Sequence, residues 1–338
     1  MPCGKLPHMS MRYRVMELLA DGRFHSGEWL GERLGISRAA VWKHVRALSD
    51  AGVGLHAVRG QGYRLTTPYQ PLQAQRILAE LSAGNAARLQ DLEVLRSVDS
   101  TSDYLKRTRT QHDVHRTRAC LAEHQSAGRG RRGRRWISPY GSSLYLSLAI
   151  PMDEPGIQSG GLSLVAAVAT LRALQVCGVE GLGLKWPNDI FYRERKLAGI
   201  LLDLSGEAGG CYQVIMGIGI NVRIPDGAAQ EIDQPWADFS HCGVPVDRNR
   251  LAGSVLDSLL KAVAVFNEQG LDNFVRQWRR FDLIADRMVE LRNDHAVVVA
   301  GIARGVDGQG ALLIESNGIT HRYHAGEVSV RPVEASLS

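Results

Sequence analysis

Two lysines bracket the segment whose side chains are best suited to chemistry. Lys185 opens the run Lys185-Trp186-Pro187-Asn188-Asp189-Ile190, and Lys196 opens a second run that continues to Leu201. A lysine ammonium is a compact charge that can approach two anions at once, which helps when a carboxylate must attack the α-phosphate of ATP. The amide and the carboxylate that follow Lys185 can orient the nucleotide or a Mg²⁺ ion. A surface turn built on Pro187 and Asp189 is the competing interpretation, and the spacing by itself favours neither.

A loop of arginines and glycines is the second candidate site. Residues 128–136 contain five arginines and three glycines, which suit no core element because glycine frees the backbone and like charges repel. We expect this loop to be mobile until an anion orders it, since guanidinium and backbone N–H groups suit phosphate or carboxylate. A loop that closes over an anionic nucleotide intermediate is favoured over an RNA-binding arm or a solvated linker.

Two shorter motifs carry weaker signals. The run Asp99-Ser100-Thr101-Ser102-Asp103 precedes a helical pattern, so it is either a helix N-cap or a set of hydroxyls that bond a small polar ring. The run Gly217-Ile218-Gly219-Ile220-Asn221 puts two glycines in a strand, which indicates a close approach of a ligand to the backbone. It lacks the third glycine and the following helix of a dinucleotide-binding motif.

The elements that must position these residues alternate between helix and strand from residue 72 to 280. An apolar helix is predicted over residues 162–176, β-rich runs over 197–204 and 212–222, and helices over 250–268 and 274–281. Beyond residue 288 the pattern changes to short strands between glycine and Asn/Asp turns, which indicates a small β-barrel. These strands are predicted at residues 289–291, 296–303, 311–316 and 321–323.

The N-terminal segment reads as a winged helix-turn-helix. Three short helices are predicted, over residues 11–20, after Ser26 and after Ser37, and a glycine-rich hairpin follows at 56–65. The third helix exposes Arg38, Lys43 and His44, and the wing adds Arg59. Such a helix can place side chains at base edges while basic residues hold phosphates. A solvated basic face on a small helical domain is the alternative.

Composition and charge agree with this division. The chain has 338 residues, of which 44% are hydrophobic, and this excludes a mainly disordered protein. Its net charge is +5, and residues 1–68 alone carry 10 basic against 5 acidic side chains, which suits a DNA-binding segment. No apolar run is long enough for a membrane span or a signal peptide. The five scattered cysteines are expected to be cytoplasmic thiols.

In this order, the motifs resemble those of the BirA family, the bifunctional biotin–protein ligases and biotin operon repressors. The resemblance extends from about residue 24 to 331, and the arginine–glycine loop together with the Lys-Trp-Pro-Asn-Asp run is its most specific part. It rests on Ser37-Arg38-Ala39-Ala40-Val41-Trp42-Lys43-His44, Gly60-Gln61-Gly62-Tyr63, Asp99-Ser100-Thr101, Gln125-Ser126-Ala127-Gly128-Arg129-Gly130-Arg131, Lys185-Trp186-Pro187-Asn188-Asp189, Arg195-Lys196-Leu197-Ala198-Gly199-Ile200-Leu201, Gly217-Ile218-Gly219-Ile220-Asn221 and Gly305-Val306-Asp307-Gly308-Gln309-Gly310-Ala311-Leu312.

The resemblance implies an α+β multidomain chain. Its parts would be a winged helix-turn-helix at residues 1–68, a class II synthetase-like α/β ligase core at 69–283 and an SH3-like β-barrel at 284–338. The implied enzyme is a biotin–[acetyl-CoA-carboxylase] ligase, which joins biotin and ATP into biotinyl-5′-AMP and passes biotin to a lysine of the biotin carboxyl carrier protein. It would use ATP and Mg²⁺. The adenylate would also act as corepressor, favouring a homodimer that represses the biotin operon by binding operator DNA.

The resemblance also implies roles for individual residues, with Lys185 and Arg131 as the catalytic pair and no assigned metal ligand. Many relatives carry Asn where this chain has Ser102. The implied biotin contacts are Ser100, Thr101, Ser102, Gln125, Arg129, Gly130, Arg131 and Lys185. The implied ATP contacts are Arg131, Arg134, Trp136, Asn188, Asn221 and Trp236. The implied DNA contacts are Ser37, Arg38, Lys43, His44 and Arg59.

Three alternatives stay open at this point. The chain could be a ligase whose N-terminal domain no longer represses transcription. It could be a biotin-responsive transcription factor without ligase activity, although Lys185 and the complete arginine loop count against this. It could also carry out the related lipoate ligase chemistry, which the biotin-type loop and the N-terminal domain disfavour.

Overall fold

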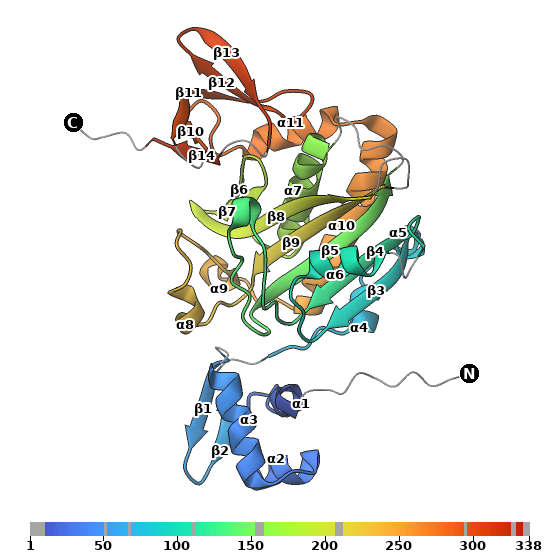
Figure 1. The fold of residues 1–338 in the computed structure, drawn as a ribbon, viewed down its shortest axis with the longest axis vertical. Coiled ribbons are helices and arrows are strands. Elements are labelled where there is room, and N and C mark those ends of the chain that lie inside the picture. Colours follow the sequence, from blue (N-terminus) through green and yellow to red (C-terminus); the bar gives the residue numbers. More distant parts are fainter. Residues whose placement is uncertain are drawn as a thin grey trace, which may run out of the picture.

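The N-terminal part forms the predicted winged helix-turn-helix, as the computed structural model of the chain shows (Figure 1). Ser26 caps the second helix by accepting a hydrogen bond from the Trp29 N–H (3.0 Å), and Ser37 caps the third through the Ala40 N–H (3.2 Å). His25 pairs with Tyr63, so the chain before the second helix joins the wing. The elements are α1 (Met11–Leu18), α2 (Gly27–Leu34), α3 (Arg38–Asp50), β1 (Leu55–Val58) and β2 (Gly62–Leu65).

The structure describes residues 11–50, 53–66, 69–109, 113–152, 159–206, 212–293, 296–325 and 329–333. Ala51 and Gly52, which follow the third helix, lie outside these residues, as do Thr67 and Pro68 at the expected first domain boundary.

A seven-stranded mixed sheet forms the centre of the molecule. Its strand order is β3-β4-β5-β9-β8-β7-β6. Only β3 and β4 run parallel among the described strands, and every other neighbouring pair is antiparallel. The strands are β3 (Leu89–Leu95), β4 (Thr117–Ala122), β5 (Ser143–Met152), β6 (Leu182–Lys185), β7 (Asp189–Tyr192), β8 (Arg195–Ser205) and β9 (Tyr212–Asn221).

Helices cover both faces of this sheet and bury its apolar side chains. The long helices α7 and α10 pack against each other and form the main core with the sheet, while α6 lies on the opposite face over β4, β5 and β9 (Figure 1). The apolar helix predicted at 162–176 is α7, and the two predicted after residue 250 are α10 and α11. The helices are α4 (Ala74–Leu78), α5 (Ala83–Arg88), α6 (Thr101–Arg107), α7 (Ser159–Val176), α8 (Asp226–Ala229), α9 (Phe239–Cys242), α10 (Arg248–Gln269) and α11 (Asp272–Phe281).

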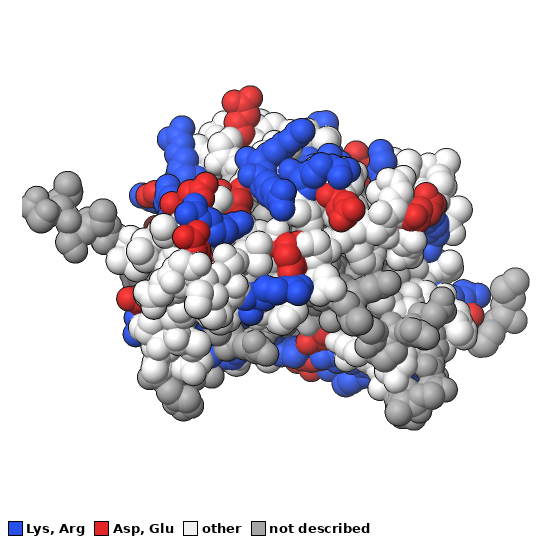
Figure 2. All heavy atoms as spheres, turned by 90° about the horizontal axis from the view of Figure 1, so that it is seen from above, with Lys and Arg blue, Asp and Glu red and all other residues white. Residues whose placement is uncertain are grey.

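The C-terminal part is a five-stranded antiparallel sheet of order β13-β12-β11-β10-β14. This confirms a small all-β domain, and its last strand was not predicted. Figure 2, which views this end of the molecule, shows basic and acidic side chains side by side, in agreement with ion pairs such as Arg304 with Asp286. The strands are β10 (Met288–Arg292), β11 (Val297–Val306), β12 (Leu312–Ser316), β13 (Ile319–Tyr323) and β14 (Ser329–Pro332).

Two general expectations can be compared with the described residues. None of the described helices combines the length and the apolar character that crossing a bilayer requires. Within the same residues, Cys120, Cys177 and Cys242 are free thiols.

Candidate functional site

The Lys-Trp-Pro-Asn-Asp run forms a buried hairpin turn between β6 and β7. Lys185 ends β6 and pairs in register with Asp189, which begins β7. Trp186 is buried, and its Nε1–H donates to the Gly310 carbonyl of the C-terminal domain (3.1 Å). The peptide bond between Trp186 and Pro187 is cis. The alternative of a surface turn is therefore wrong, because Trp186 and Asn188 are buried.

Cationic side chains converge around Asp189. Lys196 Nζ lies 2.8 Å from Asp189 Oδ1. Burial lowers the pKa of Lys185; Asp189 opposes this shift, while Lys196 and other nearby cations add to it. Burial also lowers the pKa of Arg131, again against the opposing charge of Asp189. A group of cations that repel one another around a single carboxylate is prepared to receive further negative charge.

Lys196 is not among the implied biotin and ATP contacts, although it lies in the site. The sequence marked it as one of only two lysines flanking this stretch, but did not show that β8 returns it to Asp189. Its ammonium also lies over the Trp136 ring, 5.5 Å from the ring centroid. That distance allows a cation–π contact.

The arginine–glycine loop is folded back on itself and fixed to its surroundings. The Gly130 N–H donates to the Arg134 carbonyl (2.7 Å), and the Trp136 N–H donates to the Gly128 carbonyl (2.9 Å). A short 3₁₀ turn, η2 (Arg131–Gly133), makes the reversal. Arg132 Nη1 donates to the Arg292 carbonyl in the C-terminal domain (3.1 Å). The expected mobility of the loop before ligand binding stays a prediction.

Glycines in β8 and β9 make room for Trp136. Gly199 and Gly219 face each other in the sheet, and a Cβ on Gly219 would lie 2.5 Å from Trp136 Cε2. A Cβ on Gly217 would lie 2.7 Å from Ser102 Oγ. The glycine motif indicated a close approach to the backbone, but the approach of a ligand stays a prediction. The groups that approach the backbone are side chains of the site itself.

Hydroxyl groups form a buried cluster at the start of α6. Ser100 is the helix N-cap, so the two interpretations of this motif are compatible. The Thr101 N–H donates to Gln125 Oε1 (2.8 Å), and the Thr101 and Ser102 hydroxyls lie 2.7 and 2.9 Å from Ser147 Oγ. Ser147, in β5, is a member that sequence reasoning missed, since nothing near it in the chain marks it.

The other proposed nucleotide contacts hold the framework together. The Asn188 side-chain amide donates to the Ile200 carbonyl, and that of Asn221 donates to the Ala237 carbonyl (3.0 Å). Trp236 forms an isolated β-bridge with Lys196. Its ring makes a T-shaped contact with the His241 ring, with 5.2 Å between the ring centroids. Arg134 is exposed at the loop surface.

The proposed DNA contacts lie on one element and its wing. Arg38 and Lys43 are exposed on α3, His44 is half-buried, and Arg59 is exposed at the tip between β1 and β2. The Ser37 hydroxyl is engaged as the helix cap. This is the disposition expected of a recognition helix and a basic wing.

Three buried donors of the arginine–glycine loop lack partners among the described residues. They are Arg129 Nε, Arg131 Nη2 and Trp136 Nε1. A buried polar group without a partner is costly, so each donor suits an acceptor oxygen supplied by a ligand. The donor set therefore fits biotin and a nucleotide phosphate. Within the described ranges, no group of three or more His, Cys, Asp or Glu side chains is placed to hold a metal ion.

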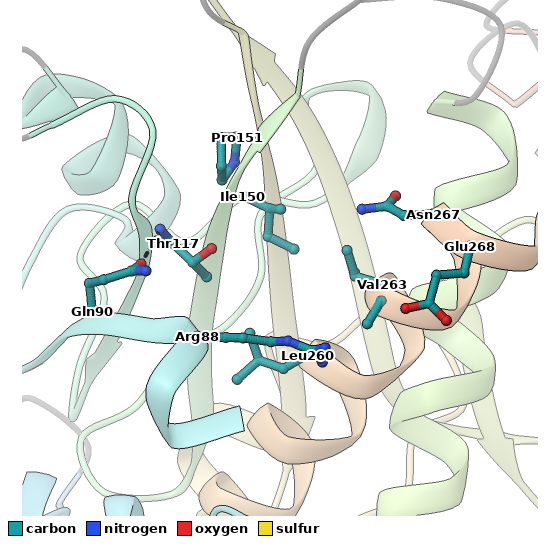
Figure 3. Close-up of a pocket in the computed structure, with 10 residues that line it drawn as sticks. Arg88, Gln90, Thr117, Ile150, Pro151, Leu260, Val263, Asn267 and Glu268 are labelled. Atoms are coloured by element: carbon teal, nitrogen blue, oxygen red, sulfur yellow. Dashed lines mark hydrogen bonds between the residues drawn. The ribbon is translucent and has the colours of Figure 1, made fainter. Parts of the chain in front are cut away.

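A separate cavity of about 390 Å³ lies away from this site (Figure 3). Its lining includes Arg88, Thr117, Pro151 and Glu268. Thr117 and Pro151 lie at the ends of β4 and β5 remote from the loop and the hydroxyl cluster. The cavity is therefore not part of the candidate site.

Comparisons with known proteins agree with this geometry. The model of the Biotin/lipoate A/B protein ligase family matches residues 94–221, an HTH domain model matches 12–64, and the Biotin protein ligase C terminal domain model matches 286–331. The chain is 42% identical over 320 residues to the bifunctional ligase/repressor BirA of Salmonella typhimurium, covering 95% of this chain and 97% of the relative. It is 31% identical to the BirA of Bacillus subtilis, covering 94% and 98%.

A solved structure is also similar. The biotin protein ligase from Aquifex aeolicus in complex with biotin and ATP superposes with a TM-score of 0.62 and 29% identity, covering 72% of this chain and all of that one.

Proposed function

The chain belongs to the biotin protein ligase family that includes the bifunctional ligase/repressor BirA, and from this premise we propose that it is an ATP-dependent biotin–protein ligase that also represses transcription. The observation that carries the ligase activity is that Lys185 and Lys196 flank Asp189, whose charge also acts on Arg131 of the arginine–glycine loop.

The first reaction joins the biotin carboxylate to the α-phosphorus of ATP. A carboxylate oxygen forms the new bond, the bond to the β,γ-phosphates breaks, and pyrophosphate leaves. The two reactants are both anionic, so they repel each other until fixed cations offset their charge. We assign this role to Lys185 and Arg131, with Lys196 as an additional cation. Bound Mg²⁺ neutralises phosphate charge, and Asn188 is a proposed neighbour of the phosphates and the metal.

The second reaction transfers biotin to the carrier protein. The amine of a carrier lysine attacks the acyl carbon of biotinyl-5′-AMP, and AMP leaves. The mixed anhydride must be kept from water until the carrier arrives, and the closed loop at residues 128–136 provides that cover. Trp136 places its indole within the cover, over β8 and β9.

The hydroxyl cluster is the proposed site for the polar ring of biotin. It is buried and offers several hydrogen-bonding groups at short spacing, which suits a small neutral ring. The proposed biotin contacts are Ser100, Thr101, Ser102, Gln125, Arg129, Gly130, Arg131 and Lys185. The proposed ATP contacts are Arg131, Arg134, Trp136, Asn188, Asn221 and Trp236.

The repressor activity uses the winged helix. Arg38, Lys43, His44 and Arg59 are the proposed contacts to operator DNA, with Ser37 at the start of the same helix. A homodimer that forms when biotinyl-5′-AMP is bound would double these contacts on a palindromic operator, which makes DNA binding depend on biotin supply. The proposal includes a cytoplasmic location, where the DNA and the carrier are both accessible.

Carrier biotinylation tests the ligase. Wild type with biotin, ATP, Mg²⁺ and a biotin carboxyl carrier domain should label the carrier, and Lys185→Ala should lower the rate by about 100-fold or more. Lys261→Ala, which removes an exposed lysine from α10, is the matched control and should keep the wild-type rate. An unchanged rate in Lys185→Ala would refute the assignment of Lys185, and no labelling by wild type would refute the ligase.

A mobility-shift assay tests the repressor. The probe is the DNA upstream of the biotin-synthesis genes of the source genome. We expect a shift that requires biotin and ATP, and Arg59→Ala should weaken it while reducing the salt dependence by about one ion. If the labelled carrier appears but no adenylate-dependent shift does, the protein is a ligase without repressor activity.

A further inference from the structure

Four charged side chains form a cluster at the edge of the ligase site. Arg129 Nη2 lies 2.9 Å from Asp103 Oδ1 and 2.5 Å from Asp203 Oδ2. Lys106 Nζ lies 2.9 Å from the same Asp203 oxygen and 3.8 Å from Asp103 Oδ1. The cluster contains two cations and two carboxylates, so its charge is balanced without a ligand.

The cluster joins three elements that form the site. Arg129 belongs to the arginine–glycine loop, and Asp203 lies on β8. Asp103 and Lys106 lie on α6, the helix whose first turn carries the hydroxyls proposed to bind biotin. The cluster therefore ties the first half of the loop to the wall of the biotin pocket.

Arg129 and Arg131 are two residues apart, and each has one buried nitrogen without a hydrogen-bond partner in the described part of the chain, but their terminal nitrogens differ. Arg131 keeps a buried Nη2 without a partner among the described residues, which leaves it available to an anion. The Nη2 of Arg129 is already shared by two carboxylates. A guanidinium that is neutralised in this way adds little attraction for a third anion. Its side chain is therefore better placed to hold the loop than to hold the substrate carboxylate, which revises the proposed biotin contact at Arg129.

We propose that Asp103 and Asp203 are positioning residues that act through Arg129 to keep the arginine–glycine loop closed over the biotin pocket. This role rests on the proposed function and deepens it, and it limits the mobility that the loop's composition predicts before an anion binds. The four side chains are 20 to 35% exposed, so each pair alone is partly screened by water. Together they offset the entropy of holding a glycine-rich loop in one conformation.

Trypsin reads the state of this loop directly, because the five arginines of residues 129–135 are all cleavage sites. Without any ligand, Asp103→Asn/Asp203→Asn should be cleaved in the loop about tenfold faster than wild type, since two charge-assisted contacts are lost. Asp103→Glu/Asp203→Glu keeps both carboxylates and should stay near the wild-type rate. Asp286→Asn is the control, because it removes one carboxylate of an exposed ion pair within the C-terminal domain.

Cleavage sites are identified by mass spectrometry, and urea midpoints establish that each variant is folded. Asp103→Asn alone changes a partly exposed carboxylate and serves if the double variant unfolds. It should raise the loop cleavage rate about threefold. Loop cleavage at the wild-type rate in folded Asn variants would overturn the proposal.

Kinetics separates positioning from a general structural effect. In Asp103→Asn/Asp203→Asn, KM for biotin should rise about tenfold, while kcat at saturating biotin stays within about twofold of wild type. Salt at about 0.5 M screens exposed charges strongly, so it should raise KM in wild type more than in the variant. A fall in kcat with KM unchanged would overturn the positioning role. The cleavage assay needs no ligand, so it remains decisive even if wild type fails to biotinylate a carrier.

Discussion

The chemistry of the site depends on how each cation is surrounded. Lys185 and Arg131 are partly buried near one carboxylate, and burial lowers the pKa of both. Burial removes the water that would otherwise screen their charge, so each interacts more strongly with a substrate anion. At this scale, the environment of a side chain matters more than its type.

The lowered pKa of Lys185 predicts a pH profile. Because the ammonium loses its proton below the usual 10.5, the rate of ATP–pyrophosphate exchange should fall on the alkaline side before an ordinary lysine titrates. Lys185→Arg keeps its charge and should move this fall to higher pH. The stability of the fold should change in the other direction. At neutral pH, burying the charged ammonium lowers the free energy of unfolding. This loss disappears as the pH rises through the lowered pKa towards 10.5. If the exchange rate falls at the same alkaline pH in wild type and Lys185→Arg, Lys185 is not the group that titrates.

Gly219 predicts a second effect at the scale of one residue. Gly219→Ala would place a methyl group 2.5 Å from Trp136 Cε2, so the indole and its loop must shift. We expect dissociation of biotinyl-5′-AMP to accelerate by about tenfold, measured by stopped-flow fluorescence. Gly84→Ala is the control, because its added methyl group meets nothing within 4 Å. Equal dissociation rates in the two variants would exclude Trp136 as part of the cover.

At the scale of elements, one buried ion pair joins segments that are distant in the sequence. Arg248, at the start of α10, lies 2.8 Å from Glu123 Oε2, and both side chains are 4% exposed. Arg248 also donates to the Gln70 and Ser143 carbonyls (2.8 Å each), and Glu123 accepts from the Leu72 N–H (2.7 Å). These bonds fix the end of β4, the start of β5 and the chain that leaves the winged helix. Glu123 stands two residues before Gln125 of the biotin pocket.

Glu123→Gln should therefore destabilise the protein strongly. It leaves the Arg248 charge buried without its counterion, and such losses cost about 3–5 kcal/mol of unfolding free energy. Asp286→Asn breaks an exposed pair and should cost far less. Urea denaturation measures both. Similar losses in the two variants would show that water reaches the Arg248 side chain.

At the scale of the whole molecule, the winged helix and the ligase core share an apolar boundary. The Tyr13 and Tyr140 rings stack with 4.8 Å between centroids, and Glu17 forms an ion pair with Arg96. Tyr69 belongs to the same buried cluster as the core of the winged helix. The start of the chain that leaves the winged helix is therefore partly built into the boundary. Tyr140 closely follows the arginine–glycine loop, so the boundary lies against one end of that loop.

Weakening this boundary should separate the two parts thermally. Stacked aromatic pairs are worth about 0.5–1.5 kcal/mol beyond the area they bury. Tyr13→Ala/Glu17→Gln should convert a single calorimetric transition into two, with the winged helix unfolding several degrees earlier. Arg250→Ala, an exposed substitution elsewhere, should leave one transition. A single unshifted transition in the double variant would mean that the boundary adds no stability.

Much of the fold could be predicted because its signals are local. Ser26 and Ser37 are followed by apolar residues at helical spacing, and these fixed the starts of α2 and α3 to the residue. The apolar run of α7 and the glycines of β9 were equally informative. The end of α1 and the existence of β14 were missed, because helix ends depend on weak terminal hydrogen bonds and a short edge strand exists only through its partner β10.

The site was predictable in its motifs but not in its contacts. Thr101 and Gln125 were both singled out, and they are bonded to each other. Ser147 and Lys196 were not singled out as contacts, since only the sheet brings them to the cluster. Because the site residues are far apart in the sequence, the sequence does not show which of their side chains face each other.

By itself, the sequence determined the family, the three kinds of structure along the chain and the residue types available for adenylate chemistry, because caps, periodicity and motifs act over a few residues. Only the tertiary structure decided what each of these side chains does. Arg129 and Arg131 are alike in the sequence, yet the Nη2 of Arg129 is paired with Asp103 and Asp203, while the Nη2 of Arg131 has no partner among the described residues. The physical reason is that burial and ion pairing depend on distance in space, and Asp203 is 74 residues from Arg129 along the chain.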